Sequence, residues 1–80
     1  MPKSQFSPQY KTFCAMLLAA RQKSGLSQQD VADRLGRPQS WVSKYETGER
    51  RLDVVELLEV ADVIGFSAER FVRELQKVSG

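Results

Sequence analysis

The sequence predicts a single all-α domain of five helices. Apolar residues recur at the spacing of one helix face. Four of these segments begin at a capping residue and four end at a glycine, whereas no segment alternates like a half-buried strand. With 80 residues, the chain has room for one core only, so residues 1–80 are expected to form one domain. A core of this size is marginal, which favours a second subunit.

The first helix is predicted over residues 8–24. Residues 1–6 lack periodicity and are expected to form a flexible arm. Ser7-Pro8 then supplies an N-cap and a proline at the first helical position. Apolar residues follow helical spacing, and Gly25 is placed to end the helix in a left-handed conformation.

The second and third helices are short and close together. Ser27 opens the second helix, and Asp30 completes an imperfect capping box, because its side chain is shorter than that of Glu or Gln. Gly36 ends this helix. Pro38 presets a helical φ angle and begins a third helix about three residues later, which ends before Gly48. The two helices therefore meet at a tight turn.

A fourth helix extends from an Asp53 cap to Ile64, and Ser67 caps a fifth. The fifth helix carries its apolar residues on one face: Ala68, Phe71, Val72, Leu75 and Val78. In the fourth helix, one apolar arc contains Val54, Leu57, Leu58, Val60, Ala61 and Ile64. Val55 and Val63 lie outside this arc, on the acidic face. A monomer would leave Val55 and Val63 exposed. We therefore expect them, with help from Phe66 or the end of the fifth helix, to form the interface of a homodimer.

Cysteine, histidine and hydropathy argue against enzymes and membrane proteins. One cysteine, Cys14, and no histidine exclude an intramolecular disulfide, a zinc cluster and histidine-based catalysis. We therefore expect no enzymatic activity, no metal and no cofactor, and a cytoplasmic location. The longest apolar run, Phe13 to Ala20, has eight residues, far fewer than the ~18 of a membrane span.

Charge is distributed unevenly along the chain. Residues 1–52 contain nine basic and four acidic residues, a net charge of +5, whereas residues 53–80 contain three basic and six acidic residues, a net charge of −3. An excess of positive charge in one part of a chain favours an anionic partner. Double-stranded DNA is the first candidate.

Residues 28–47 meet the steric requirements of a helix-turn-helix unit. Ala32 is small where the two helices approach each other, and Gly36 can adopt a positive φ in the turn. The positions that would hold the two helices together are all apolar: Val31, Leu35, Val42 and Tyr45. This unit places its second helix in the major groove of DNA.

Further motifs lie within and around this unit. They are Leu26-Ser27-Gln28-Gln29, Val31-Ala32, Leu35-Gly36, Val42-Ser43, Glu46-Thr47-Gly48, Arg50 and the stretch from Leu57 to Gly65. In these motifs, over about residues 10–75, the sequence resembles the XRE-like helix-turn-helix family of phage repressors and Cro. The resemblance implies a compact five-helix, lambda-repressor-like DNA-binding domain in which the third helix reads base edges.

The resemblance also implies roles for individual residues. Base contacts are expected from Gln39, Ser40 and Lys44, since Gln can pair with adenine and Lys can reach guanine. A structural salt bridge is expected between Arg21 and Glu46. Phosphate contacts, which position a protein without reading sequence, are expected from Gln28, Ser43, Arg50, Arg37 and Arg51.

The sequence leaves open the roles of two residues at the third helix. Pro38 stands where the family commonly has Ser or Thr, which removes a side-chain cap and a polar base contact. Trp41 flanks the buried stripe, and its indole could either pack against the fourth helix or donate its N–H to a phosphate.

The sequence therefore predicts a sequence-specific transcriptional regulator, either a repressor or an autoregulatory controller, that binds a palindromic operator as a homodimer. The alternative is an antitoxin or protein-interaction module of the same fold, whose activity is set by a protein partner such as a toxin.

Overall fold

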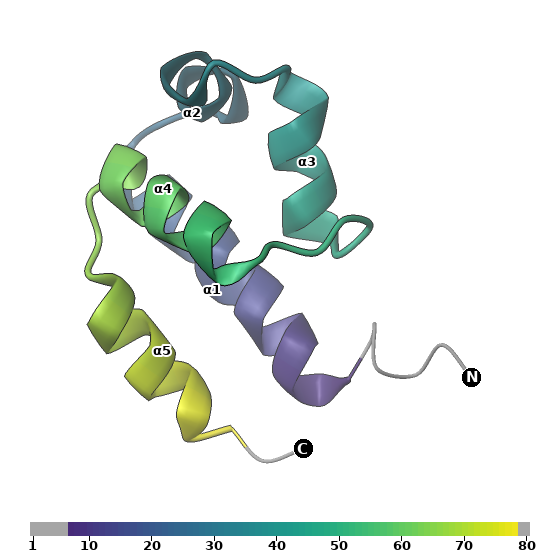
Figure 1. Cartoon of the computed structure of the whole chain (residues 1–80), viewed down its shortest axis with the longest axis vertical. Helices are drawn as coiled ribbons and strands as arrows, with labels where there is room; N and C mark the ends of the chain where they lie inside the picture. The colour runs from purple at the N-terminus through teal and green to yellow at the C-terminus, as the bar shows by residue number, and fades with distance from the viewer. Residues whose placement is uncertain (1–6, 79–80) are drawn as a thin grey trace.

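The computed structural model describes residues 7–78, which form five α-helices (Figure 1). In chain order these are α1 (Pro8–Ser24), α2 (Gln28–Leu35), α3 (Gln39–Thr47), α4 (Val54–Ile64) and α5 (Ala68–Gln76). The described residues contain no strand, and the all-α fold class is confirmed. The arm expected over residues 1–6 lies outside the part of the chain that the structure describes.

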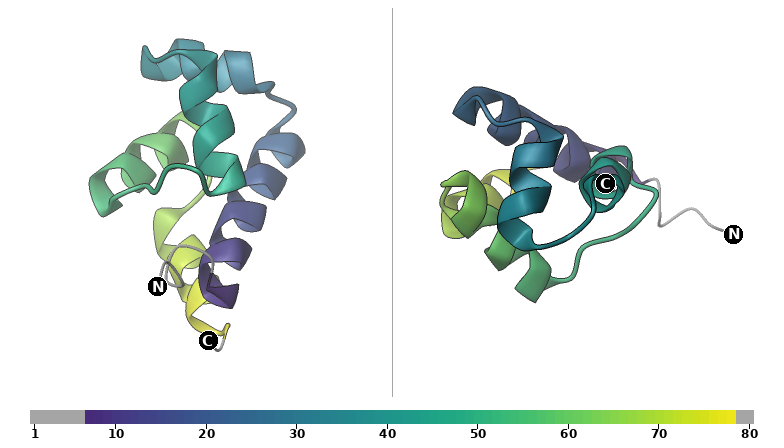
Figure 2. Two further views of the ribbon diagram at one scale, coloured as in Figure 1. Left: turned by 90° about the vertical axis from the view of Figure 1, so that its right-hand side faces the viewer. Right: turned by 90° about the horizontal axis from the view of Figure 1, so that it is seen from above.

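α1 and α4 each pack against three other helices. α1 contacts α3, α4 and α5, α4 also contacts α2 and α5, and α2 contacts α3. The left view of Figure 2 looks onto α3, which lies in front of α1 and α4. One side of α3 is therefore free of other helices, which is the first requirement for an element that enters a DNA groove.

Local capping determines where α2 begins. The Asp30 N–H donates to Ser27 Oγ at 3.0 Å, and the Ser27 N–H donates to Asp30 Oδ2 at 2.9 Å. The capping box at this end is therefore complete, although a shorter acidic residue had been expected to leave it imperfect. A reciprocal box of the same kind, formed by Asp53 and Glu56, begins α4.

The turn between α2 and α3 depends on Gly36 and Pro38. Gly36 adopts a φ of +69°, and the N–H of Arg37 donates to the Ala32 carbonyl at 3.0 Å, which closes a Schellman-type stop. Pro38 is the N-cap of α3, with ψ at 153° and no side-chain cap, whereas the first helical position had been expected. Proline restricts φ but leaves ψ free, so the ring permits either position.

The core draws side chains from all five helices. Val31, Ala32, Val42 and Tyr45 are fully buried, and Leu35 packs partly buried against them. These are the apolar positions expected to hold α2 against α3, so α3 has a rigid base. The other members of the core are Phe13, Cys14, Leu17, Leu57, Val60, Ile64 and Phe71.

The surface of α4 differs from expectation. Val55 is 64% exposed, but Val63 and Phe66 pack against the core, so the expectation that Val63 is exposed is wrong. Val54 and Leu58, placed in the buried arc by helical periodicity, are 72% and 52% exposed. Neighbouring helices cover a narrower arc of α4 than its apolar residues occupy.

α5 buries only part of its expected apolar face. The Phe71 ring is buried and lies edge-on to Phe13, with centroids 5.6 Å apart. Leu75 and Val78 are half-buried, but Val72 is exposed. Together with α4, α5 therefore leaves apolar side chains on the surface.

Candidate nucleic-acid interface

The free side of α3 carries the residues expected to contact DNA bases. Gln39, Ser40 and Lys44 are exposed, and Ser43 is half-buried. They can face outward because Val42 and Tyr45, on the opposite side of the same helix, are fully buried. The core thus determines which side of α3 meets solvent.

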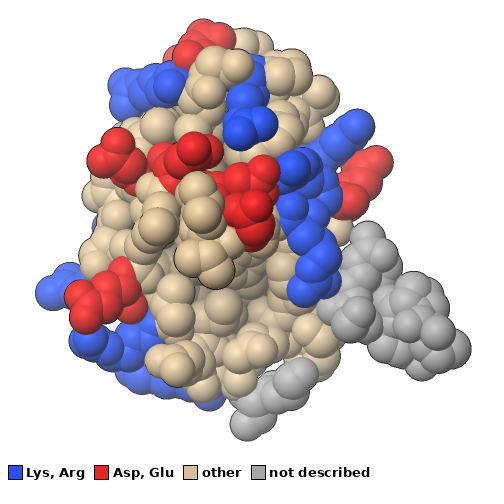
Figure 3. Space-filling view, in the orientation of Figure 1, with Lys and Arg blue, Asp and Glu red and all other residues tan. Residues whose placement is uncertain are grey.

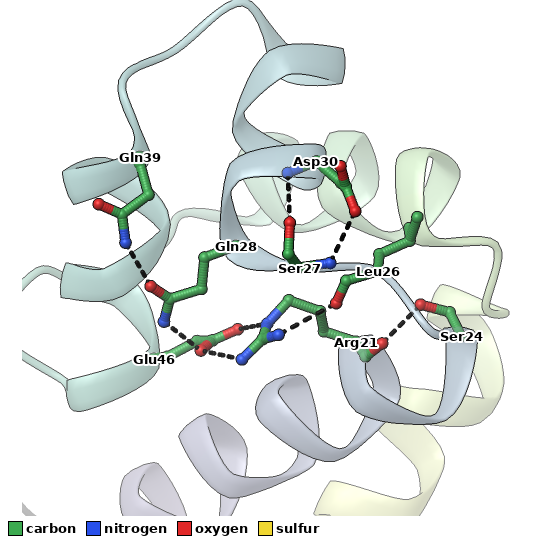
Figure 4. Close-up of polar contacts among 8 residues, drawn as sticks. All are labelled: Arg21, Ser24, Leu26, Ser27, Gln28, Asp30, Gln39 and Glu46. Carbon is green, nitrogen blue, oxygen red and sulfur yellow. Dashed lines mark hydrogen bonds and ion pairs between the residues drawn. The ribbon is translucent and has the colours of Figure 1, made fainter.

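An ion pair connects α1 to α3 behind this surface (Figure 4). Arg21 Nε donates to Glu46 Oε2 at 2.7 Å and Nη2 donates to Oε1 at 3.1 Å, while Nη1 donates to the Leu26 carbonyl at 3.0 Å. The Glu46 side chain is only 4% exposed. The hydrogen bonds to Glu46 raise the pKa of the Arg21 guanidinium further above its usual value.

This ion pair extends to the surface through two glutamines (Figure 4). Gln28 Nε2, at the first residue of α2, donates to Glu46 Oε1 at 2.9 Å. Gln39 Nε2, at the first residue of α3, donates to Gln28 Oε1. The side chain expected to read bases is therefore oriented through Gln28 by the buried carboxylate of Glu46.

Two arginines that are expected to contact phosphates stack on the indole ring of Trp41. The guanidinium carbon of Arg37 lies 4.3 Å from the centroid of the indole, and that of Arg50 lies 4.9 Å from it. Trp41 also meets Tyr45 edge-on at 5.4 Å and packs against the core. Trp41 therefore packs against the core and carries two arginines on its ring, while a contact of its indole N–H with a phosphate stays a prediction.

The same arginines are paired with carboxylates of α4. Arg50 Nη1 and Nη2 donate to the two oxygens of Glu56, at 3.2 and 3.1 Å. A longer ion pair of 3.8 Å joins Arg37 to Glu59. Figure 3 shows acidic side chains across the middle of one face with a column of basic side chains beside them. At these two ion pairs, basic residues from the positively charged part of the chain contact acidic residues from the negatively charged part.

The remaining phosphate candidate, Arg51, is exposed, with its guanidinium carbon 4.0 Å from the Tyr10 ring centroid. Along the chain, Arg37 comes before α3, and Arg50 and Arg51 come after it. We call these three arginines the basic rim.

Sequence reasoning missed several contacts of this interface. They are Gln28 with Gln39, Gln28 with Glu46, Arg50 with Glu56, Arg37 with Glu59, and both arginines with Trp41. Each of the two glutamines had been considered by itself, as a DNA contact. The spacing of Asp53 and Glu56 is a capping-box signature that could have indicated Glu56. Nothing local indicates that its carboxylate also reaches Arg50.

Over residues 7–78, His, Cys, Asp and Glu side chains form no group that could hold a metal ion. No helix in this part of the chain is both long enough and apolar enough to cross a membrane.

Comparisons with known proteins agree with this geometry. The sequence profile of a helix-turn-helix domain matches residues 15–74. An XRE-family like protein from Pseudomonas syringae pv. tomato str. DC3000 has a similar structure, with a TM-score of 0.84 and 40% sequence identity. The match covers 90% of this chain and 88% of that protein. No curated protein matches the sequence significantly. The chain therefore belongs to the XRE-like family of helix-turn-helix DNA-binding regulators.

Proposed function

We propose that the chain is a cytoplasmic transcriptional regulator that reads a palindromic operator in double-stranded DNA as a homodimer, and that it acts as a repressor or autoregulatory controller. The observation that carries this proposal is the exposed polar side of α3, anchored from behind by fully buried Val42 and Tyr45. An element that reads bases needs exposed side chains on a rigid support.

Gln39 and Lys44 are proposed to read bases, with Ser40 as a weaker contact. The amide nitrogen of Gln39 has two hydrogens, and Gln28 accepts one of them. The other hydrogen and the amide oxygen, which points away from Gln28 in Figure 4, suit the bidentate pattern of an adenine edge. Lys44 is exposed one turn further along α3 and suits guanine O6 and N7.

The basic rim, together with Gln28 and Ser43, is proposed to contact phosphates. Arg37 and Arg50 lie together on the Trp41 ring, next to α4. Arginines gathered beside α3 can meet phosphates at that edge of a groove, which would position the helix without reading sequence. Gln28 already donates one amide hydrogen to Glu46, and its second amide hydrogen remains for a phosphate oxygen.

The homodimer is proposed to form through the exposed apolar side of α4. Val54, Val55 and Leu58 are more than half exposed and lie within one turn and a half of helix. They replace Val63 and Phe66, which pack against their own core. Two subunits that place their α3 helices in successive major grooves require half-sites about 10 bp, or about 34 Å, apart.

The same apolar side supports the alternative that a protein partner, such as a toxin, sets the activity. A partner of this kind would cover α4 of a monomer, whereas the homodimer needs no other protein. Sedimentation of the purified chain, alone and with DNA, distinguishes the two: a monomer at tens of micromolar in both cases would contradict the homodimer.

Selection of bound sequences from random duplex DNA tests the proposal as a whole. We expect an imperfect palindrome, and a loss of preference at particular positions for Gln39→Ala and Lys44→Ala. Gln76→Ala, an exposed glutamine on α5, serves as the control and should select the parental sequence. Recovery of unrelated sequences by the parent protein would refute sequence-specific binding.

A further inference from the structure

Two acidic residues of α4 lie in the DNA-binding surface although they carry the same sign of charge as DNA. Glu56 and Glu59 are one helical turn apart, and each pairs with an arginine of the basic rim. Acidic residues there reduce attraction to phosphate, so their presence needs a reason other than affinity.

The pair between Glu56 and Arg50 is held rigidly. Glu56 Oε1 also accepts the backbone N–H of Asp53 at 3.0 Å, so the capping box of α4 fixes the carboxylate that receives the guanidinium. The side chains of Arg50 and Glu56 are only 33% and 17% exposed. With Trp41 beneath the guanidinium, Arg50 is restrained from two directions.

Arg50 can still bind a phosphate while it remains paired. Its guanidinium has five N–H donors. The two hydrogen bonds to Glu56 and one to the Arg51 carbonyl leave two donors. Arg50 can therefore bind a phosphate and keep its ion pair with Glu56 only if the phosphate lies in the direction of these two donors. A phosphate elsewhere requires Arg50 to leave Glu56.

We propose that Glu56, and more weakly Glu59, are specificity-determining residues that hold Arg50 and Arg37 against Trp41, so that the basic rim favours DNA docked in the operator register over DNA docked loosely. This inference rests on the proposed function. Non-specific binding depends on cations that neutralise whichever phosphates are near, and a cation held by a carboxylate contributes less to it. In register, a fixed guanidinium loses little side-chain entropy on binding.

Glu56→Gln is the direct test. Glutamine can keep the capping box, because Gln is accepted at this position, but it removes the charge that restrains Arg50. Affinity for a scrambled duplex should rise about three- to tenfold, and the salt dependence of that binding should become steeper by about one cation per subunit. Operator affinity should change less, so the ratio of operator to scrambled affinity should fall. Glu59→Gln should act in the same direction but more weakly.

Glu69→Gln is the matched control. Glu69 pairs with Arg73 on α5 at 3.4 Å, so this variant makes the same charge change and also breaks an ion pair, but away from the basic rim. Glu69→Gln should leave the ratio of operator to scrambled affinity close to the parental value. Arg50→Lys is a second variant: it keeps the charge but loses the two-pronged pairing with Glu56, and it should lower operator affinity more than scrambled affinity.

The measurement is fluorescence anisotropy of labelled operator and scrambled duplexes at salt concentrations from about 50 to 300 mM. An unchanged ratio in Glu56→Gln, or an equal fall in Glu69→Gln, would overturn the inference while leaving sequence-specific binding intact. A parent protein that binds both duplexes equally would overturn the proposed function, and the inference with it.

Discussion

Replacing Glu46 by leucine removes the acceptor of three hydrogen bonds, two from Arg21 and one from Gln28. The carboxylate is almost fully buried, and the Arg21 side chain is 13% exposed, so solvent compensates little for its loss. Removing one partner of a buried pair typically costs about 3–5 kcal/mol, because the other charge remains desolvated and unpaired.

This loss is large compared with the stability of the whole domain. At about 0.05–0.15 kcal/mol per residue, a chain of 80 residues has a free energy of unfolding of about 4–12 kcal/mol. Each kcal/mol changes the Tm of a domain of this size by roughly 4–8 °C. Glu46→Leu and Arg21→Met should therefore each lower the Tm by at least about 12 °C.

Circular dichroism during thermal unfolding measures this effect. Glu69→Leu, which removes an exposed ion pair on α5, is the control and should leave the Tm within a few degrees, since surface pairs contribute little. The double variant Arg21→Met with Glu46→Leu should lose less than the sum of the single losses, because neither charge is then left unpaired. Single variants that melt like the parent, or strictly additive losses, would refute a stabilising role for the pair.

Four further outcomes are expected. Against single-base variants of the operator, Gln39→Ala and Lys44→Ala should each lose discrimination at particular positions, with about 1–3 kcal/mol lost per contact. Arg51→Ala should instead weaken all these duplexes by a similar factor and reduce the salt slope by about one per phosphate contact. Val55→Glu should shift the protein towards monomer in sedimentation, and an unchanged dimer would place the interface elsewhere. Hydrogen bonds from Arg50 lower the pKa of Glu56 below its usual 4.5. The contribution of the Arg50–Glu56 ion pair to the free energy of unfolding is therefore complete above pH 4.5, and it is lost as the pH falls through the lowered pKa. The urea midpoint of Glu56→Gln should accordingly fall less steeply than the parental midpoint on acidification.

Helix ends were predictable because they depend on residues close together in the chain. Ser27 and Asp30, three positions apart, complete their capping box whatever the rest of the fold does. The positive φ of Gly36 likewise follows from the need to stop α2 before Pro38. Pro38 was expected at the first helical position but is the N-cap of α3. The two positions differ in ψ, and the proline ring restricts only φ.

The candidate site was predictable in part. Helical periodicity requires Val42 and Tyr45 to be buried, which directs Gln39 and Lys44 to the free side of α3. The resemblance to XRE-like proteins supplied the pairing of residues 21 and 46. The bond between Gln28 and Gln39 was not predictable, since it spans eleven positions and depends on how α2 crosses α3.

The sequence by itself determined the five helices, the glycine that turns α2 into α3, and the polar side of the recognition helix, because capping and periodicity act over a few residues. Only the tertiary structure decided which apolar residues of α4 are covered. Periodicity indicates an apolar side but not how far the neighbouring helices extend over it, so Val54 and Leu58 stayed exposed while Val63 was covered. Tertiary packing also brought Arg50, in the loop after α3, to Glu56 and Trp41, since the path of that loop depends on the angle at which the helices it connects pack.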